Sequence, residues 1–316
     1  MSNHKDQFRL TVVSVSWFSS ALLARLFSNL SEKARYPDEI RYLVIDNTNG
    51  NDDHVGKLEQ LDSSIHIKAI DSKNLKGSWA HAFGLDYATQ TIETPYTLVI
   101  DPDIHVFKHH WDEFLVNELN KAQAVAIGAP YPFWKLGKYH NFPSPPFLLY
   151  KTSVFKTMGL DWTPFPHEPL RRLYYFMARQ IVRMGLFCTR RRLSQRTNLK
   201  KIAQQLESFF GVCAPDTGWR IAAGANDNSL KSLLFEEVDG MNTQFSQIPY
   251  AKALGVLADE FELYQYENEP ILTHKYSTSG YLWKTERGRD HQYWIDAIQQ
   301  IEDEMPAFLK AGSGGI

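Results

Sequence analysis

The chain has 316 residues, of which 43% are hydrophobic, 22% charged and 13% aromatic. This composition is that of a folded globular protein, and it excludes disordered, collagen-like and fibrous classes. The longest apolar runs, such as Tyr42-Leu43-Val44-Ile45, fall far short of the ~20 residues that a membrane-spanning helix needs. Two cysteines, Cys188 and Cys213, are too few for a disulfide framework or a cysteine-rich zinc site.

Lys and Arg number 34 and Asp and Glu 36, which gives a net charge of −2. Ten basic residues and no acidic one lie between Arg171 and Lys201, so the rest of the chain is net acidic. A protein that binds nucleic acid broadly is usually basic overall, and nucleic acid is therefore not expected as a partner. Residues 1–7 are not followed by the apolar segment of a secretory signal. Together with the low number of cysteines, this predicts a cytoplasmic location.

The first half of the chain alternates predicted strands with predicted helices. Runs of β-branched and apolar residues predict strands at 10–16, 40–46, 65–70, 96–101 and 124–128. Apolar residues at helical spacing predict helices at 20–30 and 78–87, with Ser78 as an N-cap. This order predicts an α/β fold with a mostly parallel, Rossmann-like sheet flanked by helices. Ligands of such sheets bind beyond the carboxyl ends of the strands, where Asp46 and Asp101 stand.

The pattern changes after about residue 130. Residues 131–146 are rich in Pro and aromatic residues and predict an ordered loop at the edge of a site, followed by a short strand at 147–150. We expect a basic helix pair over about 168–206, a helix opening near Asp216 and a C-terminal helix over about 290–310. The Gly- and Ser-rich residues 311–316 predict a flexible tail.

Asp101-Pro102-Asp103 is the central motif. It directly follows an apolar strand, and Pro102 stiffens the turn that presents the two carboxylates. Two adjacent hard oxygen ligands suit a Mg²⁺ or Mn²⁺ ion that is also held by a diphosphate. The alternative interpretation is a capped strand end with two solvated acids.

The order of these segments resembles the family-2-type glycosyltransferases of the GT-A fold. The resemblance covers about residues 9–110, and it is carried by the first strand, the Asp46-Asn-Thr-Asn-Gly turn, the Gly- and Ala-rich segment 77–88 and Asp101-Pro102-Asp103. The Asn-x-Gly usual in the family's helix appears here as His81-Ala-Phe-Gly84, which leaves the role of His81 open between a packed or capping residue and a ligand.

The resemblance implies a metal-dependent enzyme that moves a sugar from a nucleotide-diphosphate sugar to an acceptor hydroxyl, in the synthesis of a cell-surface polysaccharide or glycolipid. Residues 1–130 would form the donor half, and residues 131–310 a C-terminal acceptor-side subdomain. Three residues would lie against the nucleotide: Val13, Ser14 and Trp17, of which Trp17 could equally be a core aromatic. Asp46 would accept a hydrogen bond from the base, and Asp103 would ligate Mn²⁺ or Mg²⁺. Asp101 would contact the ribose, or it would contact the metal ion directly or through a metal-bound water.

Inverting sugar transfer also needs a base that takes the proton from the acceptor hydroxyl. Asp216, in the turn Ala214-Pro-Asp-Thr-Gly-Trp-Arg220, is the best candidate, because related enzymes place an acid before a helix that carries Arg. The alternative interpretation is an Asp that caps the helix, which does not exclude catalysis. Three further acids are held in reserve: Glu236, Glu237 and Asp239.

His274 lies in the segment 271–280, just after a predicted strand and before several small hydroxyl residues. The resemblance implies that it is the third metal ligand and that the following loop closes on the diphosphate. Phosphate oxygens would then be contacted by Lys275 and by Ser277 or Ser279. The alternative is a structural histidine. Weaker candidates for contacts are Lys135, Lys138, Tyr139 and His140.

The basic segment 171–201 allows three interpretations. On one continuous helix, Arg172, Arg179, Arg183 and Arg190 would share a face. An apolar face would be formed by Leu173, Phe176, Met177, Ile181 and Met184. Such a helix can lie on an anionic membrane surface, as suits an enzyme that extends a lipid-linked glycan, or bind a polyanionic acceptor, or be a solvated face.

Two other functions share parts of this pattern. A nucleotidyltransferase can have the same sheet and acidic pair, but it usually has a Gly- and Lys-rich loop after the first strand, where this chain reads Ser16-Trp-Phe-Ser-Ser20. A non-catalytic module that binds a sugar nucleotide or glycan would keep the pocket without turnover.

Overall fold

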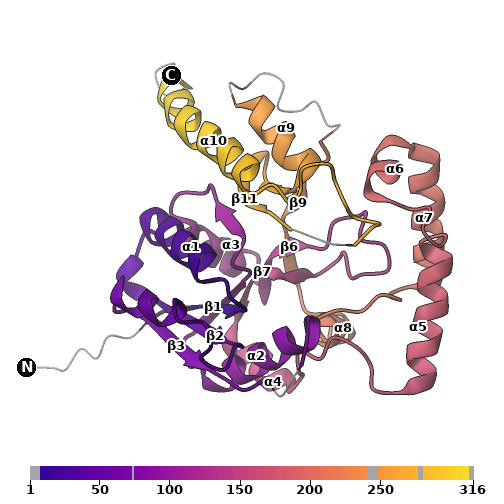
Figure 1. Cartoon of the computed structure of the whole chain (residues 1–316), viewed down its shortest axis with the longest axis horizontal. Helices are drawn as coiled ribbons and strands as arrows, with labels where there is room; N and C mark the ends of the chain where they lie inside the picture. Colours follow the sequence, from indigo (N-terminus) through magenta and orange to yellow (C-terminus); the bar gives the residue numbers. More distant parts are fainter. Residues whose placement is uncertain (1–7, 73–74, 241–247, 249, 277–279, 313–316) are drawn as a thin grey trace, which may run out of the picture.

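The computed structural model describes residues 8–72, 75–240, 248, 250–276 and 280–312. A seven-stranded sheet in the order β3-β2-β1-β4-β7-β6-β8 forms its centre (Figure 1). The strands are β1 (Leu10–Ser16), β2 (Ile40–Asp46), β3 (Ile65–Ala69), β4 (Tyr96–Ile100), β6 (Ala126–Pro130), β7 (Pro143–Lys151) and β8 (Ser232–Leu234). Among these strands only β7 runs antiparallel to its neighbours, β4 and β6. The predicted α/β fold with a mostly parallel sheet is thus confirmed.

Helices cover both faces of this sheet because its strands present apolar residues to both sides. Val12 belongs to one core cluster and Val13 to the other, as alternation along a strand requires. The first face is covered by α1 (Ser20–Lys33) and α3 (Trp111–Lys121). The second face is covered by α2 (Ser78–Thr91), α4 (Thr152–Met158) and α8 (Trp219–Asp227).

A second, smaller sheet is antiparallel and has the order β5-β11-β10-β9. Its strands are β5 (Ile104–Val106), β9 (Glu236–Glu237), β10 (Glu262–Tyr266) and β11 (Glu269–His274), packed against α9 (Ala251–Glu260) and α10 (His291–Gly312). Since β5 begins directly after Asp103 and pairs with β11, the small sheet carries the end of β11 to the end of β4.

The basic segment forms three helices at one side of the molecule (Figure 1), not the predicted pair. They are α5 (Pro169–Val182), α6 (Arg190–Gln195) and α7 (Thr197–Phe210). The chain leaves α5 at Met184 and Gly185, whose φ angles are 47° and 62°. Positive φ is incompatible with a right-handed helix, so α5 and α6 cannot be continuous.

Two arginines fasten this segment to the rest of the protein. Arg183 donates from Nε and Nη2 to the carbonyl oxygen of Leu136, at 3.2 and 3.0 Å. The buried Arg190 donates to the carbonyl oxygens of Ala258, at 2.7 Å, and Phe261. The predicted face of four arginines is therefore wrong: two of the four side chains point into the protein because backbone oxygens bind them.

Several predicted boundaries need correction. Strand β7 begins at Pro143 rather than 147, and β6 lies two residues later than predicted. Ser78 is the first residue of α2, and Gly77, with φ of 54°, is its N-cap. Helix α10 continues to Gly312, and residues 313–316 of the predicted tail lie outside the described residues.

The proposed division at residue 130 falls between β6 and β7, which pair with each other, so both halves contribute to one sheet. The two remaining short elements are the 3₁₀ helices η1 (Pro37–Glu39) and η2 (Val55–Gln60). None of the described helices combines the length and the apolar character that crossing a bilayer requires.

Candidate active site

Three potential metal ligands meet at the junction of the two sheets. Asp101 follows the last residue of β4, Asp103 precedes the first residue of β5, and His274 ends β11. One ligand atom from each lies within 4.8 Å of the others. The Nε2 atom of His274 is 3.1 Å from Oδ1 of Asp103 and 3.7 Å from Oδ2 of Asp101. The pairing of His274 with Ile104 across β11 and β5 fixes this arrangement.

A buried glutamate orients the His274 ring. Glu262 Oε2 lies 3.0 Å from Nδ1 of His274, and the Tyr264 hydroxyl donates to the same oxygen at 3.2 Å. The other oxygen, Oε1, forms an ion pair with Lys135 Nζ at 2.6 Å. Since Glu262 and Lys135 are each 2% exposed, their charges compensate each other away from water. The ring therefore presents Nε2 to the two aspartates.

The protonation of this cluster follows from burial and proximity. Burial raises the pKa of Asp101. Burial acts in the same direction on Asp103, but the charge and hydrogen bond of His274 outweigh it and lower the pKa of that carboxyl below 3.8. Burial alone would lower the pKa of His274, whereas Asp103 and Glu262 raise it to about 10. The proton on His274 thus lies between the ring and the aspartates, at the position that a metal cation bound by Asp101, Asp103 and His274 would occupy.

A pocket of about 210 Å³ opens beside this cluster. Its ionisable lining residues are His81, Asp101, Lys135, Lys138, Asp216 and His274, together with the phenols Tyr131 and Tyr276. The predicted metal ligands Asp101 and His274 and the predicted base Asp216 therefore share one pocket. His81 Nε2 lies 3.7 Å from Asp101 Oδ1, so His81 is at the site and not packed away from it.

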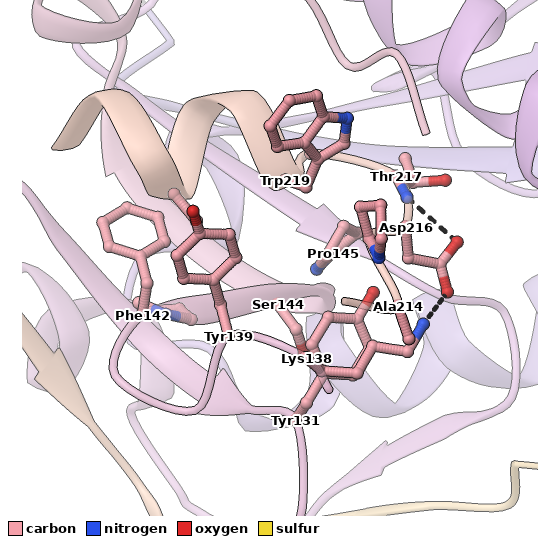
Figure 2. Close-up of a pocket in the computed structure, with 14 residues that line it drawn as sticks. Tyr131, Lys138, Tyr139, Phe142, Ser144, Pro145, Ala214, Asp216, Thr217 and Trp219 are labelled. Atoms are coloured by element: carbon pink, nitrogen blue, oxygen red, sulfur yellow. Dashed lines mark hydrogen bonds and ion pairs between the residues drawn. The ribbon is translucent and has the colours of Figure 1, made fainter. Parts of the chain in front are cut away.

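Asp216 is held in place by three donors. The Ser78 hydroxyl donates to Oδ1 at 2.7 Å and the Thr217 backbone N–H donates to the same oxygen at 2.9 Å, while Lys138 forms an ion pair with Oδ2. Figure 2 shows the carboxylate between the Thr217 N–H and the Lys138 amine. Burial would raise the pKa of Asp216, but Lys138 and the other donors lower it to about 2.

The interpretation of Asp216 as the N-cap of α8 is wrong. Gly218 takes that position with φ of 78°, and a Cβ there would lie 3.1 Å from the Trp162 ring. Only glycine combines this backbone conformation with that close approach. The turn before α8 thereby leaves the carboxylate of Asp216 free to face the pocket.

The predicted nucleotide-binding residues of β1 and β2 occupy different environments. Val13 and Ser14 are fully buried within the sheet. Asp46 is also buried, and its two oxygens accept hydrogen bonds from Thr48, through N–H and hydroxyl, and from the Gly50 N–H. A bond from Asp46 to a base would require this turn to open, so that contact stays a prediction. Trp17 is 60% exposed after β1, which makes the core interpretation of this side chain wrong.

The other predicted contacts are only partly brought to the pocket. The Lys275 backbone N–H donates to the Asp103 carbonyl at 3.0 Å, while Ser277 and Ser279 lie outside the described residues. Tyr139 lines a smaller adjoining pocket (Figure 2). His140 Nε2 pairs with Glu207 Oε1 at 3.1 Å.

The reserve acids do not line the pocket that holds Asp216. Glu237 and Asp239 border a separate cavity of about 820 Å³. There Glu237 accepts hydrogen bonds from the Phe133 N–H and the Trp134 indole, and burial raises its pKa to about 7. Of the acids considered as bases, Asp216 alone shares the described pocket with the metal-ligand cluster.

Sequence reasoning did not find Glu262, which orients His274. A usable signal was present: an acid opens the otherwise largely apolar strand Glu262-Leu-Tyr-Gln-Tyr266, and a buried acid needs a partner. Tyr131 and Tyr276 were also missed, because aromatic residues are too frequent around the pocket loops for one to stand out.

The similarity to known proteins is structural only. No family model matches the chain, and no curated protein matches its sequence. The fold resembles that of a solved mannosyltransferase. This is PcManGT from Pyrobaculum calidifontis in complex with GDP-Man and Mn²⁺, with 12% identity, a TM-score of 0.41, and coverage of 70% of this chain and 74% of that chain.

S. aureus TarS 1–349 matches with 10% identity and a TM-score of 0.40 over 83% of this chain and 98% of that chain. The same protein in complex with UDP-GlcNAc matches with 13% identity and a TM-score of 0.37 over 49% of this chain and 48% of that chain. At such identities and TM-scores, the function has to be inferred from the chemistry of the pocket.

Proposed function

We propose that this chain is a metal-dependent glycosyltransferase that moves a sugar from a nucleotide-diphosphate sugar to an acceptor hydroxyl, with inversion at the anomeric carbon. The observation that carries the proposal is the presence of two functional groups in one pocket. The first is the cluster Asp101, Asp103 and His274, of which Asp101 and His274 line the pocket, and the second is the separate carboxylate of Asp216. The cluster is suited to binding a cation together with a diphosphate, and the Asp216 carboxylate is suited to accepting a proton.

The donor set fits Mn²⁺ or Mg²⁺. Asp101 and Asp103 offer hard oxygen ligands, and His274 offers an imidazole nitrogen that Glu262 directs toward them. When bound, the cation supplies charge that stabilises the departing nucleoside diphosphate. His274 must lose its proton to ligate the cation. The opposite charges of Glu262 and Lys135 behind the ring compensate each other.

Asp216 takes the proton in the proposed reaction. The acceptor oxygen forms a bond to the anomeric carbon while the bond from that carbon to the diphosphate oxygen breaks, through an oxocarbenium-like transition state. The hydroxyl proton passes to the Asp216 carboxylate, which is ionised at neutral pH because its pKa is about 2. Lys138 and Ser78 hold the carboxylate in one orientation before the acceptor arrives.

The remaining contacts are proposals of the same kind. The nucleotide would lie near the end of β1, against the exposed Trp17, with Lys275 and Ser277 at the phosphates. Contacts with the buried Val13 and Ser14, and a bond from Asp46 to the base, would require the chain around them to open. We propose a glycan or a lipid-linked glycan as acceptor, in the synthesis of a cell-surface polysaccharide or glycolipid. The proposal names the classes of ligand seen in the PcManGT and TarS complexes, but it rests on the pocket and not on those structures.

Release of nucleoside diphosphate from a panel of nucleotide sugars, with and without Mn²⁺, tests the function. Asp103→Ala is expected to lose about 10³-fold of the metal-dependent turnover, because one ligand of the cation is removed. Asp38→Ala, at an exposed acid in η1, is the matched control and should behave as the wild type. Full turnover in Asp103→Ala would show that the assigned metal site is wrong.

Two other outcomes identify the alternative functions. Release of pyrophosphate from a nucleoside triphosphate would make the chain a nucleotidyltransferase. A nucleotide sugar that raises the unfolding temperature in the presence of Mn²⁺, with no turnover of any donor in the panel, would indicate a binding module.

A further inference from the structure

Helix α5 turns a set of apolar side chains toward solvent. Residues at positions i, i+3, i+4, i+7 and i+11 lie within a sector about 100° wide on one side of a helix. Here these are Leu170, Leu173, Tyr174, Met177 and Ile181, which we call the α5 apolar face. Their exposed fractions run from 47% to 82%. A different side of the same helix holds the buried Ala178 and Val182, so the fold uses only one of its two apolar sides.

The exposure is concentrated in the three-helix segment. Of the fifteen large hydrophobic residues that are exposed in the described part of the chain, ten lie between residues 170 and 209. Those outside the α5 apolar face are Phe176, Leu186, Phe187, Ile202 and Phe209. Single exposed apolar residues are ordinary on a soluble protein, but such a concentration indicates an interaction surface.

The same segment is strongly basic. Residues 169–211 contain ten Lys and Arg residues and one acid, Glu207. Arg191 and Lys200 pair with Glu286 and Asp239. Six other cations form no ion pair with any carboxylate in the described ranges: Arg171, Arg172, Arg179, Arg192, Arg196 and Lys201. Exposed apolar side chains and cations without a carboxylate partner therefore occur together in the segment 169–211.

We propose that the α5 apolar face and the cations around it dock on an anionic lipid bilayer. Aliphatic and aromatic side chains enter the boundary between headgroups and acyl chains, while Arg and Lys remain at the level of the phosphates. A second copy of the chain fits this surface poorly, because two strongly basic segments would face each other. An anionic bilayer satisfies both the apolar and the charged part of the surface.

A groove lies on the side of α5 away from the α5 apolar face, and Arg172 and Arg179 are among its lining residues. Its volume is about 270 Å³, and its lining includes Phe176 and Tyr175 of α5 and Trp79 of α2. Two further lining residues, Ala214 and Pro215, directly precede Asp216. Trp79 follows Ser78, whose hydroxyl donates to Asp216. The groove contains no residue of the α5 apolar face, so membrane binding by that face depends neither on this groove nor on the proposed function.

Cosedimentation with vesicles tests the proposal. The wild-type protein is expected to bind vesicles of phosphatidylcholine with about one-third phosphatidylglycerol, and to bind pure phosphatidylcholine vesicles weakly, because anionic lipid supplies the attraction to the cations. The double variant Leu173→Glu/Met177→Glu should lose about tenfold or more of its partition coefficient. Leu61→Glu, at a residue that is 67% exposed but lies outside the segment, is the control and should bind as the wild type.

Charge-reversal variants test the contribution of the cations to vesicle binding separately from that of the apolar side chains. Arg171→Glu/Lys201→Glu should also weaken binding by about tenfold or more, and added salt should weaken the binding of the wild type in the same way. Lys121→Glu, at another exposed lysine outside the segment, should leave the binding unchanged.

Three results would overturn the proposal: no binding of the wild type to the anionic vesicles, equal loss in Leu61→Glu and Leu173→Glu/Met177→Glu, or a wild-type dimer that Leu173→Glu/Met177→Glu dissociates while vesicles are not bound. The last result would make a second copy the occupant. Failure of the proposed function would look different, since Asp103→Ala should bind vesicles as the wild type does, and Leu173→Glu/Met177→Glu should still release nucleoside diphosphate from the donor.

Discussion

The pocket and the α5 surface treat charge in opposite ways. In the pocket, His274 contacts Asp103 and Glu262, Glu262 also contacts Lys135, and Lys138 contacts Asp216, so each charged group has a partner within the protein. Between residues 169 and 211, six cations form no ion pair with a carboxylate of the described residues, and ten large apolar side chains are exposed to solvent. The first arrangement is organised before any ligand arrives, and the second is completed only by something outside the chain.

The largest expected effect concerns the base of the pocket. Asp216→Asn keeps the size of the side chain and removes its ability to accept a proton, so kcat for transfer should fall by about 10²–10⁴-fold. Affinity for the nucleotide sugar, measured by calorimetry with Mn²⁺, should stay close to that of the wild type. Asp161→Asn, at an acid that pairs with Arg220 outside the pocket, is the control. If Asp216→Asn retains most of its turnover, another group accepts the proton of the acceptor hydroxyl.

The second effect tests whether the buried pair behind His274 positions that ring. Glu262→Gln should weaken Mn²⁺ binding by about 10–100-fold, because the ring loses the charged acceptor at Nδ1. It should also destabilise the protein by about 3–5 kcal/mol in urea unfolding, because Lys135 is left as a buried unpaired charge.

A companion variant separates these two effects. Glu262→Gln/Lys135→Met removes both charges, so it should recover most of the stability and little of the affinity for Mn²⁺. If the affinity returns together with the stability, Glu262 acts through folding alone and does not position His274.

A smaller effect appears in the pH dependence of transfer. Lys138 holds the pKa of Asp216 at about 2, below the ordinary 3.8, while burial acts in the opposite direction. In Lys138→Met the pKa of Asp216 is therefore expected to rise from about 2, although Ser78 and Thr217 still donate to the carboxylate, and the acidic limb of the kcat/KM profile should move to higher pH. Lys121→Met provides the matched control. An unchanged acidic limb would mean that Asp216 ionisation does not govern it.

The smallest effect compares the two sides of α5. Val182→Ala removes a fully buried side chain and should cost about 1–3 kcal/mol of unfolding free energy. Leu173→Ala removes a side chain that is 55% exposed and should change the stability by less than about 0.5 kcal/mol. Urea denaturation measures both. A large cost for Leu173→Ala would show that the α5 apolar face is covered by the protein itself.

The central sheet was predictable because its strands carry their own signal. The β-branched and apolar residues of Leu10–Ser16 and Ile40–Asp46 identify buried strands without reference to the rest of the chain. The acids after β4 follow from the same reasoning, since the end of a parallel strand is a place where ligands bind.

The contacts between distant segments were harder to predict. The partner of His274 is an acid on another strand, and the partner of Asp216 is a lysine 78 residues away. Periodicity reports which face a residue takes, but not which residue lies opposite it. For the same reason, a helical wheel placed Arg183 and Arg190 on a shared face, although the chain turns at Gly185 and backbone oxygens bind both guanidinium groups.

The hydrogen bonds from Arg183 to Leu136 set a limit on how far the protein can be shortened. The strip from Lys135 to Lys138 carries two amines of the pocket, and it rests on α5 through this guanidinium and on Cys213 and Ala214 through the Gly137 carbonyl. Deleting residues 168–206 would strip the cover from Trp134 and Leu136, which are packed against that segment. A shortened protein without residues 168–206 should therefore lose the contacts that position Lys135 and Lys138 in the pocket.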